Sequence, residues 1–137
     1  MSDSSRWIKL AKQDQKMAEL AYNARLYNQV CFHCQQGAEK CLKAFLLEKD
    51  GKFPKTHSLA ELLSLASFRN PSLEDLMDEC LYLDLFYIPT RYPDAPLGSL
   101  PEGEPKRKDA QKAMQILTDI LKRITKELSG LKKHGRP

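Results

Sequence analysis

Apolar residues recur every three or four positions over most of this chain, and that spacing predicts amphipathic helices. The pattern runs through residues 5–24, where lysines and glutamines fill the other face, with Asp3, Ser4 or Ser5 as the cap. After a break at Tyr27-Asn28 it continues over residues 29–49, and Asp50-Gly51 supplies a stop. Two long helices are therefore expected in the first fifty residues.

Two shorter helices are expected in the middle of the chain. Ser58 is followed three residues later by Glu61, which is the spacing of a capping box, so a helix should begin there and end near Phe68. Asn70-Pro71 interrupts the pattern. A helix then restarts over residues 72–87, too apolar for full exposure, with acids in its first turn.

Residues 88–105 lack any helical pattern. Six of the eight prolines fall between positions 71 and 105, and two glycines lie among them, so a long loop is predicted. The pattern returns over residues 106–129 as a final helix that Gly130 should end. Residues 131–137 read as a basic flexible tail.

Together these segments predict an all-α fold, a four- to five-helix up-and-down bundle built from helical hairpins. The length of 137 residues suits a single domain, placed at residues 1–130. No apolar stretch approaches a membrane span or the core of a signal peptide, so we expect a cytoplasmic protein without membrane contact. In that compartment the four cysteines should be reduced.

Charge is distributed unevenly along the chain. From residue 104 to the end there are ten Lys/Arg against four Asp/Glu, a net +6, although the whole chain carries only +4. Residues 74–84 hold five acids and no base. An acidic and a basic surface could steer a polyanion, a charged protein or a second copy of the chain.

The second helix carries the first candidate chemistry. Gln36, Lys40 and Lys43 are spaced to share one side, with Glu39 adjacent, and two ammonium groups with an amide can hold a phosphate. The alternative is a solvated face on which Glu39 and Lys43 form an ordinary surface ion pair.

Two histidines invite opposite interpretations. His57 lies at a predicted helix start, where backbone N–H groups favour an anion, although it could simply order that start. His33 lies between Cys31 and Cys34 in zinc-like spacing, but on a helix it points away from them. Buried thiols explain the cysteines better, so we predict no metal site and no cofactor.

The segment from Tyr87 to Asp94 is the most function-like. Prolines fix the backbone on both sides of Arg91-Tyr92. Arg91 offers a planar fork for phosphate or carboxylate, and Tyr87 or Tyr92 offers a ring on which a base can stack. Alternatively, Arg91 pairs with a core acid such as Glu39 and joins the loop to the second helix.

These segments, in this order and spacing, resemble the HEPN family, the higher eukaryotic and prokaryotic nucleotide-binding domains. The resemblance covers about residues 5–128. The matching residues are Phe32-His33-Cys34-Gln35-Gln36 with Glu39-Lys40 and Lys43-Ala44, then Thr56-His57-Ser58-Leu59 with Leu62, then Tyr87 with Arg91-Tyr92-Pro93-Asp94.

The resemblance implies a helical bundle that forms a homodimer and acts with a small nucleotidyltransferase; some members bind nucleotides. Another branch contains metal-independent ribonucleases, including toxins of toxin–antitoxin pairs, that carry an arginine followed after four to six residues by a histidine. No histidine follows Arg91 at that spacing, nor Arg25 or Arg123. We therefore expect a non-catalytic module.

In this module Lys40, Lys43, His57 and Arg91 would bind phosphate, supported by Gln36, Glu39, Tyr87, Tyr92 and Asp94. A nucleotide is the expected ligand, and RNA is not favoured. Two alternatives stay open: a metal-independent ribonuclease that uses Arg91 with His57, and a purely structural dimer whose charged faces recruit a protein.

Overall fold

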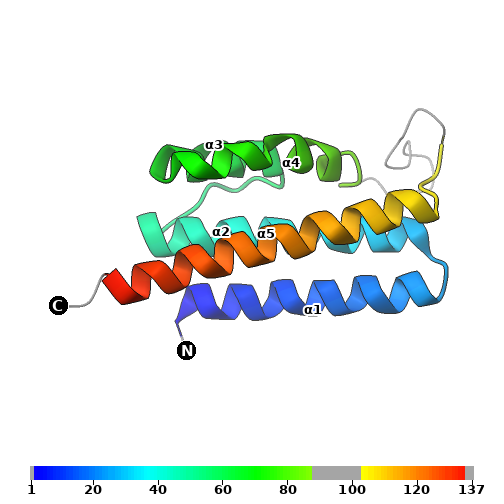
Figure 1. The fold of residues 1–137 in the computed structure, drawn as a ribbon, viewed down its shortest axis with the longest axis horizontal. Coiled ribbons are helices and arrows are strands. Elements are labelled where there is room, and N and C mark those ends of the chain that lie inside the picture. The colour runs from blue at the N-terminus through cyan, green and yellow to red at the C-terminus, as the bar shows by residue number, and fades with distance from the viewer. Residues whose placement is uncertain (1, 88–102, 135–137) are drawn as a thin grey trace.

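A computed structural model describes residues 2–87 and 103–134, with side chains as far as residue 130. The all-α prediction is confirmed. The elements are α1 (Asp3–Asn23), α2 (Tyr27–Asp50), α3 (Leu59–Arg69), the 3-10 helix η1 (Pro71–Leu76), α4 (Met77–Asp84) and α5 (Arg107–His134). The three long helices lie side by side, and α3, η1 and α4 form a shorter layer against one side of them (Figure 1).

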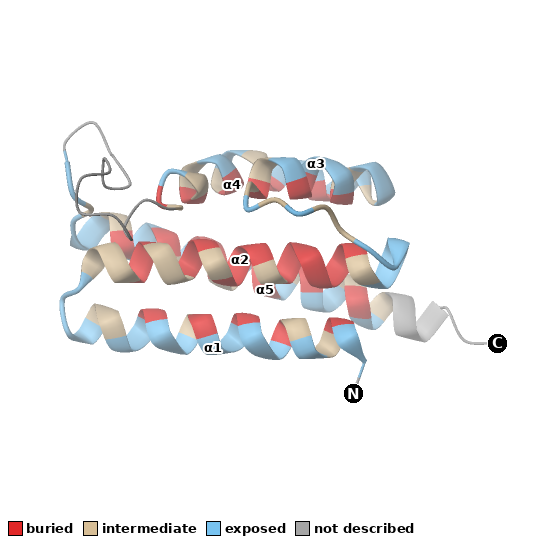
Figure 2. Ribbon diagram, turned by 180° about the vertical axis from the view of Figure 1, so that it is seen from behind, coloured by how far each residue is buried: buried red, intermediate tan, exposed pale blue. Residues whose placement is uncertain are grey.

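Helix α2 is the centre of the bundle. It contacts α1, α3, α4 and α5, and thirteen of its residues are buried (Figure 2). A Cβ added at Gly37 would lie 3.0 Å from Leu117 of α5 and 3.3 Å from Asp14 of α1. Glycine therefore allows three helices to meet closely at this point.

The start of α1 and the break between α1 and α2 differ from the prediction in position. Ser2, rather than a later residue, caps α1: its Oγ accepts from the Ser5 backbone N–H at 3.2 Å. Ser4 is buried and donates to Glu48 instead. The break falls at residues 24–26, and α2 begins at Tyr27, where the break was predicted. Gly51 ends α2 with φ of 71°, as predicted.

The second layer follows the prediction with two differences. Ser58 caps α3, but its predicted reciprocal partner Glu61 accepts instead from the Thr56 hydroxyl at 2.7 Å. The segment after Asn70 begins as the 3-10 helix η1 before it becomes α4, which ends at Asp84 rather than at the predicted residue 87. On α4 the apolar residues divide, because Leu83 is buried whereas Leu81 is half exposed.

Helix α5 passes Gly130 without ending and continues to His134, so residues 131–134 of the predicted tail are helical. Among the described helices, none has the length and apolar character that crossing a bilayer requires. Residues 88–102, which make up most of the predicted loop, are outside the described residues. The candidates Arg91, Tyr92 and Asp94 fall in that range.

Candidate ligand-binding site

A buried carboxylate on α2 organises the first cluster of polar side chains. Glu39 Oε2 accepts from Lys43 Nζ at 2.9 Å, and Glu39 Oε1 lies 3.0 Å from His57 Nδ1. The side chains of Glu39 and Lys43 are only 7% and 8% exposed, whereas that of His57 is 56% exposed. We call these three residues the Glu39 cluster.

The backbone around His57 is held from two other helices. Gln35 of α2 is fully buried, and its Nε2 donates to the His57 carbonyl at 2.8 Å. Asp84, the last residue of α4, accepts from the backbone N–H groups of Leu59 and Ala60 at 2.8 and 3.1 Å. A carboxylate at this helix start satisfies free N–H groups and complements the dipole of α3. The backbone that carries His57 is therefore fixed in position.

An aromatic ring completes the site. Tyr87 stacks on His57 with ring centroids 4.7 Å apart and an interplanar angle of 17°. Lys43 Nζ lies 5.2 Å from the centroid of the Phe53 ring. Because Glu39 engages Nδ1 of His57, Nε2 is the ring nitrogen that remains for a ligand.

The other lysine of α2 belongs to a second cluster with the same composition. Asp14 of α1 accepts from Lys40 Nζ through Oδ2, and its Oδ1 lies 3.0 Å from His33 Nδ1. The His33 and Lys40 side chains are 22% and 24% exposed. We call Asp14, His33 and Lys40 the Asp14 cluster; it joins α1 to α2.

The structure thus brings together four of the predicted site residues, Glu39, Lys43, His57 and Tyr87, and separates Lys40 from them. Gln36 lies beside them and donates to Gln35 Oε1 at 2.8 Å. The Glu39–Lys43 pair exists, but the expectation of a surface pair is wrong because both side chains are buried. Lys43 consequently neutralises Glu39 and presents little of its ammonium group to solvent.

Two supporting residues were not predicted as such. Gln35 appeared only as part of a matching motif, and Asp84 only as one of five acids in an acidic stretch. Asp84 contacts residues 24–26 positions earlier, and a local sequence pattern does not reveal such contacts.

The cysteines show the chemistry of buried thiols. All four are free and buried. Burial raises the pKa of both Cys31 and Cys80 to about 12, with smaller contributions from the nearby acids Asp109 and Asp84 respectively. The described residues contain no group of three His, Cys, Asp or Glu arranged to hold a metal ion.

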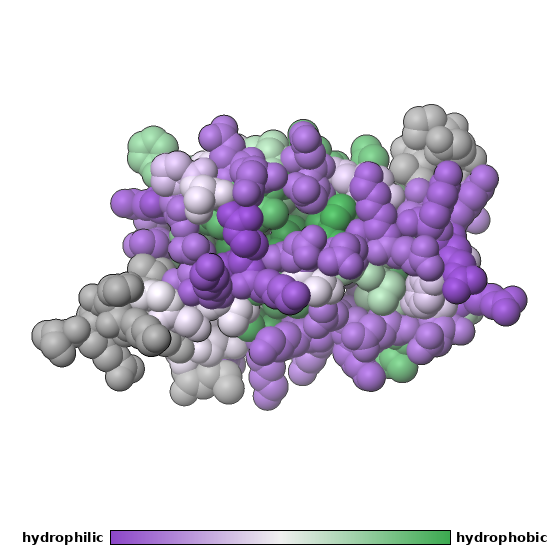
Figure 3. Space-filling model, in the orientation of Figure 1, coloured by the Kyte–Doolittle hydropathy of each residue, from purple (hydrophilic) through white to green (hydrophobic). Residues whose placement is uncertain are grey.

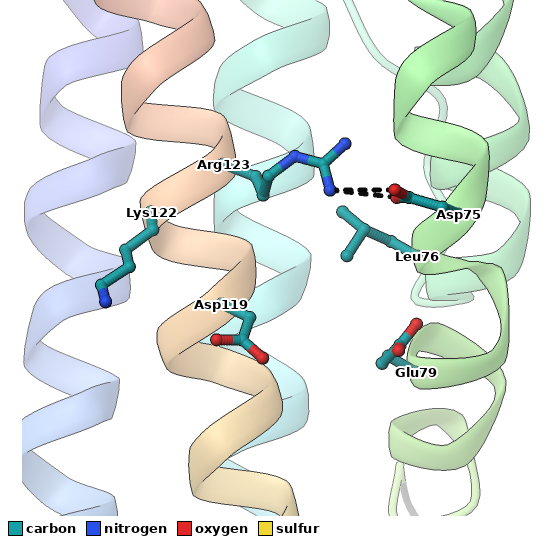
Figure 4. A pocket seen from close by; sticks show the side chains of 6 residues that line it. All are labelled: Asp75, Leu76, Glu79, Asp119, Lys122 and Arg123. Carbon is teal, nitrogen blue, oxygen red and sulfur yellow. Dashed lines mark hydrogen bonds and ion pairs between the residues drawn. The ribbon is translucent and has the colours of Figure 1, made fainter.

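Acidic and basic residues also meet across a cavity of about 330 Å³ that η1 and α4 form with α5 (Figure 4). Arg123 of α5 donates to Asp75 at 3.0 Å and to the Ser72 carbonyl at 2.7 Å. Apolar surface shows between α5 and the α3–α4 layer on this otherwise mostly hydrophilic face (Figure 3). The contacts of Arg123 therefore use part of the uneven charge in the sequence to join α5 to the layer formed by α3, η1 and α4.

Comparison with known proteins identifies the fold. No match was found among the curated proteins. Among solved structures, an archaeal HEPN homologue shares 31% identity with a TM-score of 0.71 and covers 93% of this chain and 98% of its own. The protein TT1696 from Thermus thermophilus shares 29% sequence identity with a TM-score of 0.74, and the match covers 92% of this chain and 98% of that protein. A HEPN domain protein from Thermotoga maritima shares 28% sequence identity with a TM-score of 0.71, and the match covers 90% of this chain and 98% of that protein.

The sequence comparison agrees with the structural one. The HEPN domain model matches residues 4–128, nearly the range over which the motifs suggested a resemblance. Apart from the residues at the two ends, the match covers all the helices described above. The chain belongs to the HEPN family.

Proposed function

We propose that this HEPN domain is a non-catalytic module that binds a nucleotide or a similar phosphate compound at the Glu39 cluster. The exposed His57 ring, which stacks on the partly buried Tyr87 ring and contacts a buried ion pair, carries the proposal. Burying charged side chains costs free energy unless they are well paired, and here the pairing holds an imidazole at the surface. The adjoining ring offers a face for a base, and His57 Nε2 offers a contact for phosphate.

The proposal assigns Arg91 to the phosphate as well, since Arg91 follows Tyr87 by four residues in the sequence. The chain is assigned a binding role because none of its three histidines follows an arginine by four to six residues. Any chemistry on the ligand would then fall to a partner, for which we propose a small nucleotidyltransferase.

The proposal also includes a homodimer. On α1, Leu10, Met17 and Leu20 are 43–52% exposed. Their spacing of seven and three residues is that of a helix-pairing seam, which supports association through a helix face.

Calorimetric titration of ATP tests the binding claim. We expect His57→Ala and Arg91→Ala to weaken ATP binding at least tenfold, because each removes a phosphate contact. His33→Ala is the matched control and should bind as the wild type does. Absent binding, or equal binding in all four proteins, would refute the nucleotide claim.

The partner and dimer claims need separate measurements. Light scattering should report twice the chain mass, and Met17→Lys should return the protein to one chain mass. A nucleotidyltransferase encoded beside this chain should co-purify with it when the two are expressed together. A monomer that captures no such enzyme would contradict both claims and would also remove the structural-dimer alternative.

One observation favours a second candidate, a metal-independent ribonuclease. A carboxylate bound to Nδ1 of an exposed histidine orients the other ring nitrogen for proton transfer, as acid–base cleavage of RNA needs. This candidate predicts growth arrest on expression, and RNA cleavage that persists with a chelator and stops in His57→Ala. Intact RNA after long incubation with the wild-type protein would exclude it.

A further inference from the structure

A second cavity lies where α1 turns into α2 and α5 begins. Its volume is about 460 Å³, and Tyr22, Asn23, Arg25, Tyr27 and Arg107 line it. Two arginines and two tyrosines therefore border one space, and no carboxylate of the described residues lines it. Tyr27 and Glu39 are twelve residues apart on α2, so the cavity is about 18 Å along the helix from the Glu39 cluster.

The wall of this cavity is organised by hydrogen bonds. Arg107 Nε donates to the Tyr22 hydroxyl at 2.8 Å, and Gln111 Nε2 donates to the same oxygen at 2.7 Å. The Arg107 hydrogen bond is the main reason that the pKa of Tyr22 is lowered. Within the described residues this contact uses Nε, so the terminal nitrogens of Arg107 are the donors assigned to a ligand.

The two arginines also lack acidic partners within the described part of the chain. Elsewhere in it, Arg69 pairs with Asp50 and Arg123 pairs with Asp75. Neither Arg25 nor Arg107 forms an ion pair with a described carboxylate, and Lys106 and Lys108 flank Arg107 in the sequence. The cavity thus concentrates positive charge that no ion pair with a described carboxylate neutralises.

Arg25 occupies a backbone position that usually belongs to glycine. Its φ is 62°, and it is the only non-glycine residue with a positive φ among the described residues. The Leu26 N–H reaches back to the Ala21 carbonyl at 2.9 Å, as in a helix end that normally takes glycine at this point. An arginine here costs conformational free energy, and Arg25 is one of the residues that line the cavity.

We propose that this cavity is a phosphate-binding site, in which Arg25 and Arg107 take the phosphate oxygens and the Tyr27 ring flanks the group attached to them. Paired guanidinium groups match phosphate oxygens through parallel N–H donors. The phosphate can belong to a free nucleotide or to a nucleic-acid strand. This site is distinct from the Glu39 cluster and does not depend on the function proposed for it.

The test measures binding of inorganic phosphate, AMP and a short single-stranded RNA by calorimetry. Arg107→Gln and Arg25→Gly should each weaken binding at least tenfold. Arg25→Gly removes the strained backbone, so its urea midpoint should equal or exceed that of the wild type, which separates lost binding from lost folding. Arg107→Gln should also move the spectroscopic titration of Tyr22 to higher pH.

Two controls make the outcome decisive. Arg6→Gln removes one positive charge from the start of α1, at the far end of that helix, and His33→Ala alters the Asp14 cluster, to which no ligand is assigned; both should bind the three probes as the wild type does. Binding of AMP or inorganic phosphate would support the site with a free nucleotide as source, and binding of RNA alone would support it with a strand as source. No binding of any probe, or equal losses in Arg6→Gln and Arg107→Gln, would overturn the proposal.

Discussion

The Glu39 cluster and the Asp14 cluster contain the same three kinds of side chain, in the same pattern of contacts. Each has a carboxylate that joins a lysine through one oxygen and Nδ1 of a histidine through the other. They differ in what is buried. The Asp14 cluster leaves its lysine and histidine about a quarter exposed, whereas the Glu39 cluster buries the lysine and exposes the histidine.

This difference shows that composition alone does not identify a site. The Asp14 cluster lies between two long helices and is explained as a contact between them. The Glu39 cluster uses buried charge to hold one ring at the surface beside Tyr87. Parallel substitutions in the two clusters can therefore separate packing from binding.

The largest effect is expected from removing the carboxylates. Glu39→Ala leaves Lys43 buried without a counter-charge, so the free energy of unfolding should fall by about 3–5 kcal/mol. Asp14→Ala should cost about 1–2 kcal/mol, because its partners are better solvated. Urea denaturation monitored by circular dichroism measures both. Equal losses would mean that the two clusters do not differ in burial as described.

Replacing the lysines should give a smaller difference in the free energy of unfolding between the two clusters, again with the larger loss in the Glu39 cluster. Lys43→Met preserves the shape but removes the ammonium from a buried carboxylate, and we expect a loss of about 2–3 kcal/mol while His57 still donates to it. Lys40→Met should cost less than about 1 kcal/mol. The same denaturation experiment applies, and a Lys40 effect larger than that of Lys43 would reverse the comparison.

Replacing the histidines should change the free energy of unfolding least, and here the Asp14 cluster should lose more than the Glu39 cluster. His33→Ala should lower the free energy of unfolding by about 1 kcal/mol, because it removes a hydrogen bond from a partly buried carboxylate. His57→Ala should cost less than about 0.5 kcal/mol, since most of its ring is already solvated. A stability assay beside the ATP titration would show whether His57 matters more for binding than for folding. A large loss of stability in His57→Ala would assign it to packing.

The helices could be predicted because the apolar period is a local signal. The residues at which the helices begin and end were harder to predict. Ser2 caps α1 one residue before the predicted candidates, and Arg25 takes a conformation that its residue type does not suggest. The 3-10 start of the segment after Asn70 likewise leaves no distinct trace in an apolar pattern.

The site was harder to predict because it depends on how α2 is rotated about its own axis. Lys40 and Lys43 are separated by about 60° around a helix, and the packing of α1 and α3 decides which neighbour each lysine meets. The i,i+4 spacing indicated the Glu39–Lys43 pair but not its burial. The capping of α3 by Asp84 is a contact between distant positions, which only the assembled bundle reveals.

The four buried cysteines give the chain internal reporters of its own motions. Because their thiols are shielded and hard to ionise, a thiol reagent reaches them only when the bundle opens, and the rate of labelling measures those openings. Cys80 lies on α4, whereas the other three lie on α2. Modification of Cys80 ahead of Cys34 would show that the layer of α3, η1 and α4 separates from the three long helices while those helices stay together.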